Sequence, residues 1–320
     1  MNKDAKIYVA GHQGLVGSAI MRTLQAQGYC NVITRTHGEL DLANQEAVRT
    51  FFEIMRPEYV FLAAAKVGGI MANNTYPADF IYQNLAIQTN IIHESWRCGV
   101  PRLLFLGSSC IYPRDCPQPM KEQYLLTGPL EPTNRPYAVA KIAGIEMCWS
   151  YNRQYGTKYI AAMPTNLYGP GDNYNLETSH VIPALIRKMH EAKMRRDEEV
   201  VVWGTGTPRR EFLYSDDLAE ACVFIIDLAD KQHDLLLRNP SVPPLINIGC
   251  GEDLTIKELV ELVAKVIDYK GAIVWDREKP DGTMLKMLDS SFINRVGWRP
   301  RIALEEGLRL AYQYYLNNVQ

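Results

Sequence analysis

Tyr137 and Lys141 stand four positions apart in a segment with the composition of a helix, and Ser108 ends an apolar segment of strand length. This spacing places the phenol and the ammonium on one helix face, one turn apart. A phenol ordinarily loses its proton only near pH 10, and a neighbouring ammonium stabilises the phenolate. A serine hydroxyl could then hold the same carbonyl oxygen that the tyrosine protonates. These three groups suit the transfer of a hydride to a ketone, with a bound cofactor as the hydride source.

Tyrosine and lysine at this spacing also occur on ordinary amphipathic helices, so the pair needs support from other segments. A glycine motif near the N-terminus provides it: the strand-like segment 6–10 is followed by Gly11, Gly14 and Gly17, and then by a helical segment to about residue 27. Such glycines allow a tight turn, approach of the backbone to a pyrophosphate, and close packing of helix on strand. The helix N-terminus offers free N–H groups to the phosphates. The motif predicts a dinucleotide site.

The end of the second expected strand, residues 31–35, bears on which dinucleotide binds. NAD sites usually have Asp or Glu here to hold the ribose 2′-hydroxyl, whereas this strand ends in Arg35 and the next carboxylate is Glu39. Arg35 is placed to meet a 2′-phosphate, which favours NADP(H), and Asp41 and Leu42 would flank the adenine. The alternative is that Arg35 only covers the adenine face.

Strand-like and helical segments alternate as far as residue 171, with small or turn-forming residues at 64–69 and 164–171. This order predicts an α/β fold with a Rossmann-type, doubly wound parallel sheet, and its ligands at the carboxyl ends of the strands. We expect a dinucleotide-binding domain at 1–171, joined by returning elements from about 215–250. Residues 172–320 would mainly form a smaller substrate-binding lobe. Its arginines, lysines and tryptophan suit a ligand with phosphates and an aromatic ring.

The composition excludes several other classes of protein. A hydrophobic content of 47% and a net charge of −2 provide a core but no attraction for nucleic acid or a membrane surface. The sequence has neither a secretory leader pattern nor an apolar run long enough to span a membrane. Seven scattered cysteines without a C-x-x-C pair predict free thiols in a reducing cytoplasm and no metal site. Cys110 differs from the others because it lies in the proposed active loop.

Two helical segments could provide a homodimer interface. Residues 78–98 carry few charges on their apolar face, and the segment from Tyr137 has an apolar stripe of Ile142, Ile145 and Trp149. The alternative is that both stripes pack on the sheet.

Taken together, the glycine motif, Ser108, the Tyr137–Lys141 pair and residues 164–170 resemble the extended short-chain dehydrogenase/reductases that act on nucleotide sugars. The resemblance is strongest to members that work on GDP-linked 4-keto-6-deoxy sugars. It extends over essentially the whole chain, including residues 63–70, 72–81, 107–113, 179–185 and 279–283.

The resemblance implies an NADPH-dependent enzyme that first inverts C3 and C5 of the sugar and then reduces the C4 ketone. Cys110 and His180 fall at the positions that serve as base and acid for the inversions, and both side chains have suitable pKa values. Tyr137 would protonate the C4 oxygen, Ser108 would assist, and Lys141 would hold Tyr137 and the nicotinamide ribose.

The resemblance also places the binding residues. Cofactor contacts fall on Gly11, Gln13, Gly14, Leu15, Val16, Gly17, Arg35, His37, Asp41, Leu42, Ala64, Lys141, Pro164, Asn166, Leu167 and His180. Contacts to the GDP-sugar fall on Lys188, Trp203, Arg210 and Asp281. Gln13 and His37 stand where many relatives carry arginine, so the preference for NADP is expected to rest on Arg35 with help from His37. Lys188 likewise replaces a common arginine, and gives a point charge instead of a bidentate fork.

Three other functions fit the sequence less well. A 4,6-dehydratase needs a pair of acid–base groups that includes a carboxylate, and Ser109 and Cys110 occupy that place. A 4-epimerase would need neither Cys110 nor His180. A cofactor-sensing binding protein typically loses the catalytic tyrosine or lysine, and this chain keeps both.

Overall fold

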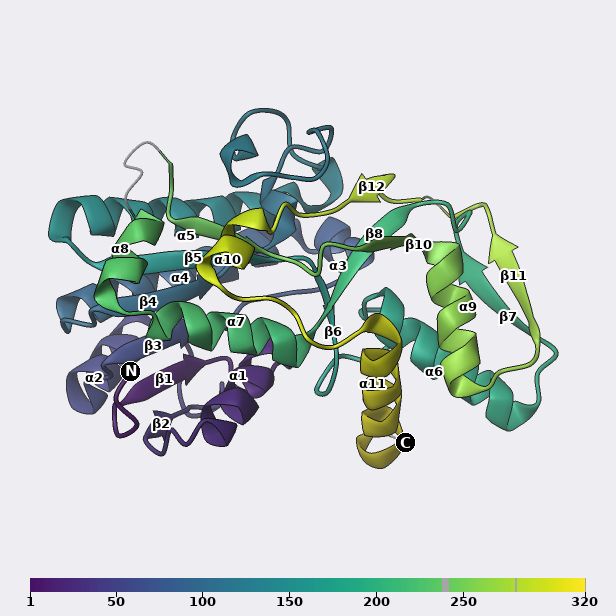
Figure 1. Cartoon of the computed structure of the whole chain (residues 1–320), viewed down its shortest axis with the longest axis horizontal. Helices are drawn as coiled ribbons and strands as arrows, with labels where there is room; N and C mark the ends of the chain where they lie inside the picture. Colours follow the sequence, from purple (N-terminus) through teal and green to yellow (C-terminus); the bar gives the residue numbers. More distant parts are fainter. Residues whose placement is uncertain (238–241, 280, 320) are drawn as a thin grey trace.

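A parallel sheet of six strands, in the order β2-β1-β3-β4-β5-β9, forms the centre of the larger lobe (Figure 1). The computed structural model describes residues 1–237, 242–279 and 281–319, and these counts refer to them. The strands are β1 (Ile7–Ala10), β2 (Val32–Ile33), β3 (Tyr59–Leu62), β4 (Arg102–Leu106), β5 (Lys158–Pro164) and β9 (Leu245–Ile248). β1 and β9 are buried along their whole length, as expected for parallel strands covered on both faces.

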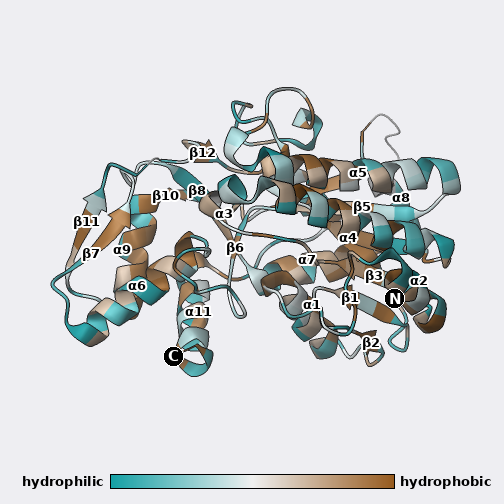
Figure 2. Ribbon diagram, turned by 180° about the vertical axis from the view of Figure 1, so that it is seen from behind, coloured by the Kyte–Doolittle hydropathy of each residue, from teal (hydrophilic) through white to brown (hydrophobic). Residues whose placement is uncertain are grey.

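Helices cover both faces of this sheet. One face carries α2 (Gln45–Met55), α4 (Pro77–Arg97) and α5 (Arg135–Tyr155), whose apolar residues form one core cluster with the sheet. The other face carries α1 (Leu15–Ala26), α7 (Ser215–Asp227) and α10 (Ser291–Val296), which contribute to a second cluster. α8 (Asp230–Leu237) follows α7. In Figure 2 the inner sides of these helices are hydrophobic and their outer sides hydrophilic. The sequence-based expectation of a doubly wound sheet is confirmed.

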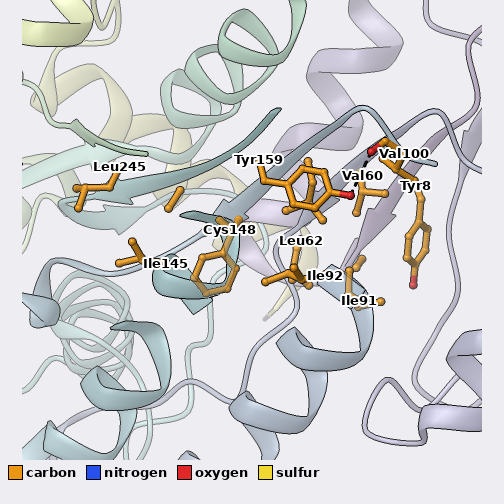
Figure 3. Close-up of a cluster of buried hydrophobic side chains, with 14 of the residues drawn as sticks. Tyr8, Val60, Leu62, Ile91, Ile92, Val100, Ile145, Cys148, Tyr159 and Leu245 are labelled. Atoms are coloured by element: carbon orange, nitrogen blue, oxygen red, sulfur yellow. Dashed lines mark hydrogen bonds between the residues drawn. The ribbon is translucent and has the colours of Figure 1, made fainter. Parts of the chain in front are cut away.

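The first cluster anchors the sheet to α4 and α5 (Figure 3). Tyr159, on β5, is fully buried, and its hydroxyl donates a 3.1 Å hydrogen bond to the carbonyl oxygen of Val100. Ile142 and Ile145 belong to the same cluster, so this part of the expected apolar stripe on α5 packs on the sheet. Each such side chain stabilises the fold by about 1.5–3 kcal/mol.

The smaller lobe is built around β8 (Arg209–Tyr214). It pairs with β6 (Asn166–Tyr168), β10 (Asp253–Thr255) and β12 (Leu285–Lys286), while β7 (Glu199–Trp203) pairs with β11 (Ala272–Asp276). α6 (Val181–Arg195), α9 (Ile256–Ile267) and α11 (Leu304–Asn318) enclose a third core cluster with these strands. Three short 3₁₀ helices lie at Ser109–Ile111, Glu122–Tyr124 and Pro132–Asn134.

The chain crosses between the lobes more than once. β9 returns to the main sheet and pairs with β5. The segment that contains β6 was expected to be only a loop. It forms a strand because its backbone pairs in parallel with β8. α3 (Ile70–Thr75) is a second element that local pattern did not indicate. No helix among the described residues is long and apolar enough to cross a membrane. Neither do those residues gather His, Cys, Asp and Glu side chains into a metal-binding group.

Candidate active site

The Ser–Tyr–Lys set meets where β4 ends against α5. Ser108 follows β4 and precedes the 3₁₀ turn at Ser109–Ile111, and Tyr137 and Lys141 lie in the first two turns of α5. A Cβ atom at Gly144 would lie 2.4 Å from the ring of Phe105, so glycine allows α5 to lie close against β4. The ammonium of Lys141 donates a 2.8 Å hydrogen bond to the carbonyl oxygen of Leu106, and lies 5.7 Å from the centroid of the Tyr137 ring.

The electrostatics of this set differ from the expectation in one respect. Burial raises the pKa of Tyr137 well above its ordinary value, the nearby Cys110 raises it further, and a hydrogen bond with Ser108 opposes the rise. Burial also lowers the pKa of Lys141 to about 8. The ammonium of Lys141 is hydrogen-bonded to the Leu106 carbonyl, and burial has the largest effect on the pKa of the phenol. The phenol is therefore held as the proton-bearing form that a reduction needs.

Cys110 follows Ser108 by two residues, in the 3₁₀ turn, and lies within electrostatic range of Tyr137. Its thiol is buried, and its backbone N–H is directed at the Ser108 hydroxyl over 3.5 Å. Burial raises the pKa of the thiol, while the charge of Lys286 and then the hydrogen bond with Ser108 act against that rise. Lys141 also lies within electrostatic range.

His180 caps α6 from the opposite lobe and approaches the same cation. Its backbone is extended at the helix N-terminus, and its side chain makes no capping hydrogen bond. Partial desolvation lowers the pKa of the imidazole, although the residue is exposed, and the charge of Lys286 lowers it further. The charge of Lys286 thus lowers the pKa of both Cys110 and His180.

The glycine motif fits a dinucleotide. Gly11 has a φ of +84°, and a Cβ there would lie 2.6 Å from the backbone nitrogen of Ala64. A Cβ at Gly17 would lie 2.0 Å from the Gly11 oxygen, whereas one at Gly14 would meet only that oxygen, at 3.5 Å. The turn at residues 11–17 thus forms a glycine cradle at the N-terminus of α1, and the cradle has free space at Gly14. A buried ring nitrogen of His12, Nδ1, has no hydrogen-bond partner among the described residues. Gln13, Leu15 and Val16 lie in this turn and the first turn of α1.

The residues after β2 are arranged less simply than the sequence implies. The Arg35 guanidinium donates to the carbonyl of its neighbour Thr34 at 2.7 Å, and lies 5.6 Å from the centroid of the Phe51 ring on α2. His37 is exposed, and its ring nitrogen lies 3.9 Å from a carboxylate oxygen of Asp41. Arg35 is thus held against Thr34 and α2, whereas His37 lies on the surface beside Asp41. Leu42 packs partly against the core.

Residues 164–167, at the end of β5 and the start of β6, make hydrogen bonds and packing contacts that stabilise the fold. Asn166 donates from Nδ2 to the backbone oxygen of Glu211 at 2.8 Å, and Thr165 donates its hydroxyl to the same oxygen at 3.1 Å. Leu167 packs partly on the second core cluster. Pro164 is the last residue of β5, at the edge where the cradle lies.

The four residues expected to contact the substrate nucleotide gather around the turn after β7. The ammonium of Lys188 lies 5.2 Å from the centroid of the Trp203 ring. Asp281 accepts from the backbone N–H of Thr205 at 3.0 Å and from its hydroxyl at 2.6 Å. Burial lowers the pKa of Arg210, and the nearby Asp281 opposes the change. Pro280, in the motif 279–283, lies outside the described residues.

Two cations near the cleft were not anticipated. Lys279 lies 5.5 Å from the Trp203 ring centroid, and Lys286 lies within electrostatic range of Cys110. The sequence could have indicated Lys286, because it is a single lysine inside the apolar run 284–288, and a charge in such a run needs a partner.

An open parallel sheet with a glycine cradle, and a Ser–Tyr–Lys set beside it, define a dinucleotide-dependent oxidoreductase. The chain belongs to the NAD dependent epimerase/dehydratase family, whose model matches residues 7–249.

The most informative similar proteins act on GDP-linked sugars. A putative GDP-L-fucose synthase 2 of Arabidopsis thaliana is 57% identical over 320 residues, which cover 100% of this chain and 94% of the relative. GDP-L-fucose synthase of Escherichia coli (strain K12) is 55% identical over 315 residues, covering 98% and 97% of the two chains. A GDP-6-OMe-4-keto-L-xylo-heptose reductase from C. jejuni has a TM-score of 0.92 and 40% identity, with 99% of each chain covered. A GDP-L-fucose synthetase from Naegleria fowleri bound to NADP has a TM-score of 0.88 and 26% identity, with 100% of this chain and 96% of that chain covered.

Proposed function

We infer that this chain converts GDP-4-keto-6-deoxy-D-mannose to GDP-L-fucose, as a 3,5-epimerase and an NADPH-dependent 4-reductase. The observation that carries the inference is the convergence of two sets of groups. Ser108 and Tyr137, which suit reduction, lie beside Cys110, which shares the cation Lys286 with His180. Full-length identity of 55–57% to GDP-L-fucose synthases supports the same reaction.

The epimerisation requires a base and an acid on opposite faces of the sugar. The 4-keto group acidifies the protons on C3 and C5. The thiolate of Cys110 takes the proton from each carbon in turn, and the protonated imidazole of His180 returns one to the other face. Two inversions give the L-configuration without net consumption of protons.

The reduction uses the other set. NADP(H), when bound, supplies the hydride for C4. Tyr137 gives its proton to the C4 oxygen, which Ser108 holds in place by a hydrogen bond. Lys141 holds the nicotinamide ribose and stays beside Tyr137 through its bond to Leu106.

Each lobe binds one nucleotide. Residues 1–171, with the returning elements from about 215–250, hold NADP(H) through the glycine cradle, Arg35 and His37. Residues 172–320 mainly hold the GDP group: Trp203 for the base, Lys188 and Arg210 for the diphosphate, and Asp281 for the ribose. Residues Ala64, Pro164, Asn166, Leu167, Asp41 and Leu42 complete the cofactor contacts.

The protein acts as a cytoplasmic homodimer. Its seven cysteines are free, which fits a reducing compartment. The outer surfaces of α4 and α5 meet at aromatic residues, with Trp96 stacked 4.2 Å from the half-exposed Tyr155, and Tyr82 is exposed about four turns earlier on α4. A mass of twice 36.3 kDa in solution, lost on Tyr155→Asp, tests the assembly by light scattering.

One assay tests the function. Purified protein is mixed with GDP-4-keto-6-deoxy-D-mannose and NADPH, oxidation of NADPH is followed by absorbance, and the product sugar is identified by NMR. GDP-L-fucose is the expected product. GDP-6-deoxy-D-talose or GDP-D-rhamnose, the products of reduction without inversion, would contradict the epimerase role.

A further inference from the structure

The segment that leads to His180 lies on the surface of the smaller lobe. Residues 175–178 are exposed, and they form a turn in which the N–H groups of Thr178 and Ser179 donate to the Asn175 oxygen at 3.2 and 2.8 Å. The side chain of His180 makes no capping hydrogen bond to α6. An exposed turn buries little apolar surface and opens easily. The position of His180 therefore depends on contacts between this turn and the rest of the molecule.

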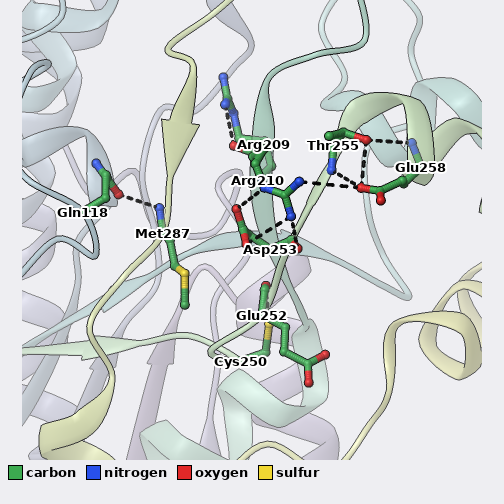
Figure 4. Close-up of polar contacts among 9 residues, drawn as sticks. All are labelled: Gln118, Arg209, Arg210, Cys250, Glu252, Asp253, Thr255, Glu258 and Met287. Carbon is green, nitrogen blue, oxygen red and sulfur yellow. Dashed lines mark hydrogen bonds and ion pairs between the residues drawn. The ribbon is translucent and has the colours of Figure 1, made fainter.

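The larger lobe provides such a contact at Gly69, the residue before α3. The backbone N–H of Gly69 donates to the carbonyl oxygen of Thr178 at 3.4 Å. A Cβ on Gly69 would lie 3.7 Å from the same oxygen, so the two backbones are in van der Waals contact. A separate link between the lobes lies at β12, where Met287 donates its N–H to Gln118 at 3.0 Å (Figure 4). The Gly69 bond joins the larger lobe to the residue two positions before His180.

Asn73 orients the peptide group that makes this contact. It lies on α3 and is 6% exposed, and its Nδ2 donates to the carbonyl oxygens of Gly68 at 2.8 Å and Gly69 at 3.0 Å. The Gly68 carbonyl and the Gly69 N–H belong to one planar trans peptide, so they point in opposite directions. Asn73 therefore holds the oxygen of this peptide on one side while its N–H is directed at Thr178 on the other.

The stability of α3 does not by itself explain an asparagine at this position. The Oδ1 atom of Asn73 is buried and has no hydrogen-bond partner in the part of the chain that the structure describes. A buried acceptor without a partner costs stability. The contribution of the side chain is thus made by its two donated hydrogen bonds.

The same turn rests on α4, next to Tyr137. A Cβ at Gly68 would lie 3.1 Å from the ring of Phe80, and this ring lies edge-on to Tyr137 at 6.2 Å. Asn84, buried one turn further along α4, donates to the Lys66 oxygen at 3.0 Å and accepts from the Lys66 N–H at 3.1 Å. The turn is therefore held at a fixed place relative to Tyr137, and it connects that place to the smaller lobe.

We propose that Asn73 is a positioning residue for the epimerisation, because it orients the Gly68–Gly69 peptide that holds the segment ending in His180. The proposal rests on the proposed function for the role of His180, but not for the hydrogen bonds themselves. Inversion needs an acid on one defined face of the sugar, and a misplacement of about 1 Å can cost about 10²-fold in rate. Reduction uses Tyr137 and does not need His180, so it continues when the segment moves.

The hydrogen bonds are tested on the free protein by amide hydrogen exchange, resolved to single residues by fragmentation mass spectrometry. Asn73→Ala removes both donated bonds, and exchange of the Gly69 N–H is expected to accelerate by at least about tenfold. Asn74→Ala is the matched control, because Asn74 is the exposed neighbour of the same type on α3, and it should leave this exchange unchanged. An unchanged rate in Asn73→Ala would overturn the proposal.

The products made from GDP-4-keto-6-deoxy-D-mannose and NADPH provide a second readout. Asn73→Ala is expected to slow inversion by at least about tenfold and to keep hydride transfer within about threefold. GDP-6-deoxy-D-talose and GDP-D-rhamnose should therefore accumulate beside GDP-L-fucose, as measured by NMR, whereas Asn74→Ala should give GDP-L-fucose alone. Equal losses of inversion and hydride transfer would mean a structural role only, and a raised KM with unchanged products would mean that Asn73 binds the sugar. Either result contradicts the proposal.

Gly69→Pro breaks the same contact from the other partner. Proline has no N–H to donate to Thr178, and the φ of −65° at Gly69 is the angle that its ring adopts. The products should shift towards the uninverted sugars as in Asn73→Ala. A normal product ratio in Gly69→Pro would refute the proposal even if Asn73→Ala does not fold, as judged by circular dichroism. Absence of GDP-L-fucose from the unmodified protein would instead refute the proposed function and leave the exchange result standing.

Discussion

The ammonium of Lys141 and the carbonyl oxygen of Leu106, 35 residues apart in the chain, are joined by a hydrogen bond of 2.8 Å. The bond connects the second turn of α5 to the end of β4. It therefore fixes the position of Tyr137 and Lys141 relative to the sheet. Because Ser108 follows Leu106 by two residues, the same bond fixes Tyr137 and Ser108 relative to each other. Burial lowers the pKa of Lys141 to about 8, so the charge of this lysine decreases within the accessible pH range.

Tyr137→Phe removes the proton donor for C4. We expect the rate of NADPH oxidation to fall by at least 10²-fold, since a positioned general acid contributes about 10²–10⁴. Stopped-flow absorbance measures the rate, and the affinity for NADP⁺, measured by calorimetry, should stay within about threefold. Phe80→Leu is a matched control, because it removes only the ring that lies edge-on to Tyr137, at 6.2 Å. Near-normal turnover in Tyr137→Phe would exclude the phenol as the acid.

Cys110→Ser separates the two halves of the reaction. The alcohol is a far weaker acid than the thiol, so it cannot provide the base, while Ser108 and Tyr137 remain for hydride transfer. We expect deuterium incorporation at C3 and C5 to fall by at least 10²-fold and reduction of the uninverted ketone to persist. NMR of the product in D₂O measures both. Cys148→Ser, a buried thiol on α5 away from the cleft, controls for general loss of a sulfhydryl. Unchanged exchange in Cys110→Ser would assign the base elsewhere.

Arg35→Ala tests the choice of cofactor. If the guanidinium leaves Phe51 to bind the 2′-phosphate, its loss removes a charged hydrogen bond worth about 1.5–3 kcal/mol, or roughly 10–150-fold in kcat/KM for NADPH. The value for NADH should change less than threefold. Arg56→Asn is the matched control, because Arg56 is an exposed arginine just past the C-terminus of α2, the helix that carries Phe51. Asparagine is chosen because it tolerates the φ of +48° at this position. Equal losses with both cofactors would mean that Arg35 only supports α2.

His233 makes stability depend on pH. It is fully buried on α8, and neither ring nitrogen has a hydrogen-bond partner among the described residues. Burial, followed by Arg102 and Lys158, lowers its pKa from 6.5 to about 4. Between these values the unfolded chain binds more protons than the native state, so stability present above pH 6.5 is lost as pH falls towards 4.

The loss amounts to roughly 3 kcal/mol when complete. Urea unfolding at pH 7.5, 6 and 5 should show this decline in the unmodified protein. The decline should be smaller in His233→Gln and unchanged in His37→Gln, which alters an exposed imidazole. Parallel pH profiles for all three proteins would show that His233 does not titrate as proposed.

The sequence by itself determined the fold class and much of the local structure. Hydrophobic periodicity and the glycines at 11, 14 and 17 are local signals, and they placed β1 and α1 within a residue or so of their observed bounds. The Tyr137–Lys141 pair was likewise readable, because helical geometry alone places i and i+4 on one face.

Only the tertiary structure decided which distant groups meet. The pairing of β6 with β8, and of β12 with the same strand, depends on backbone partners far away in sequence, so it left no local pattern. Arg35 lies against the ring of Phe51, and the ammonium of Lys141 is hydrogen-bonded to the carbonyl of Leu106. Neither contact could be predicted from the spacing of these residues in the sequence. The charge of Lys286 acts on Cys110 although the two residues come from segments far apart in the chain, so no local pattern could predict it.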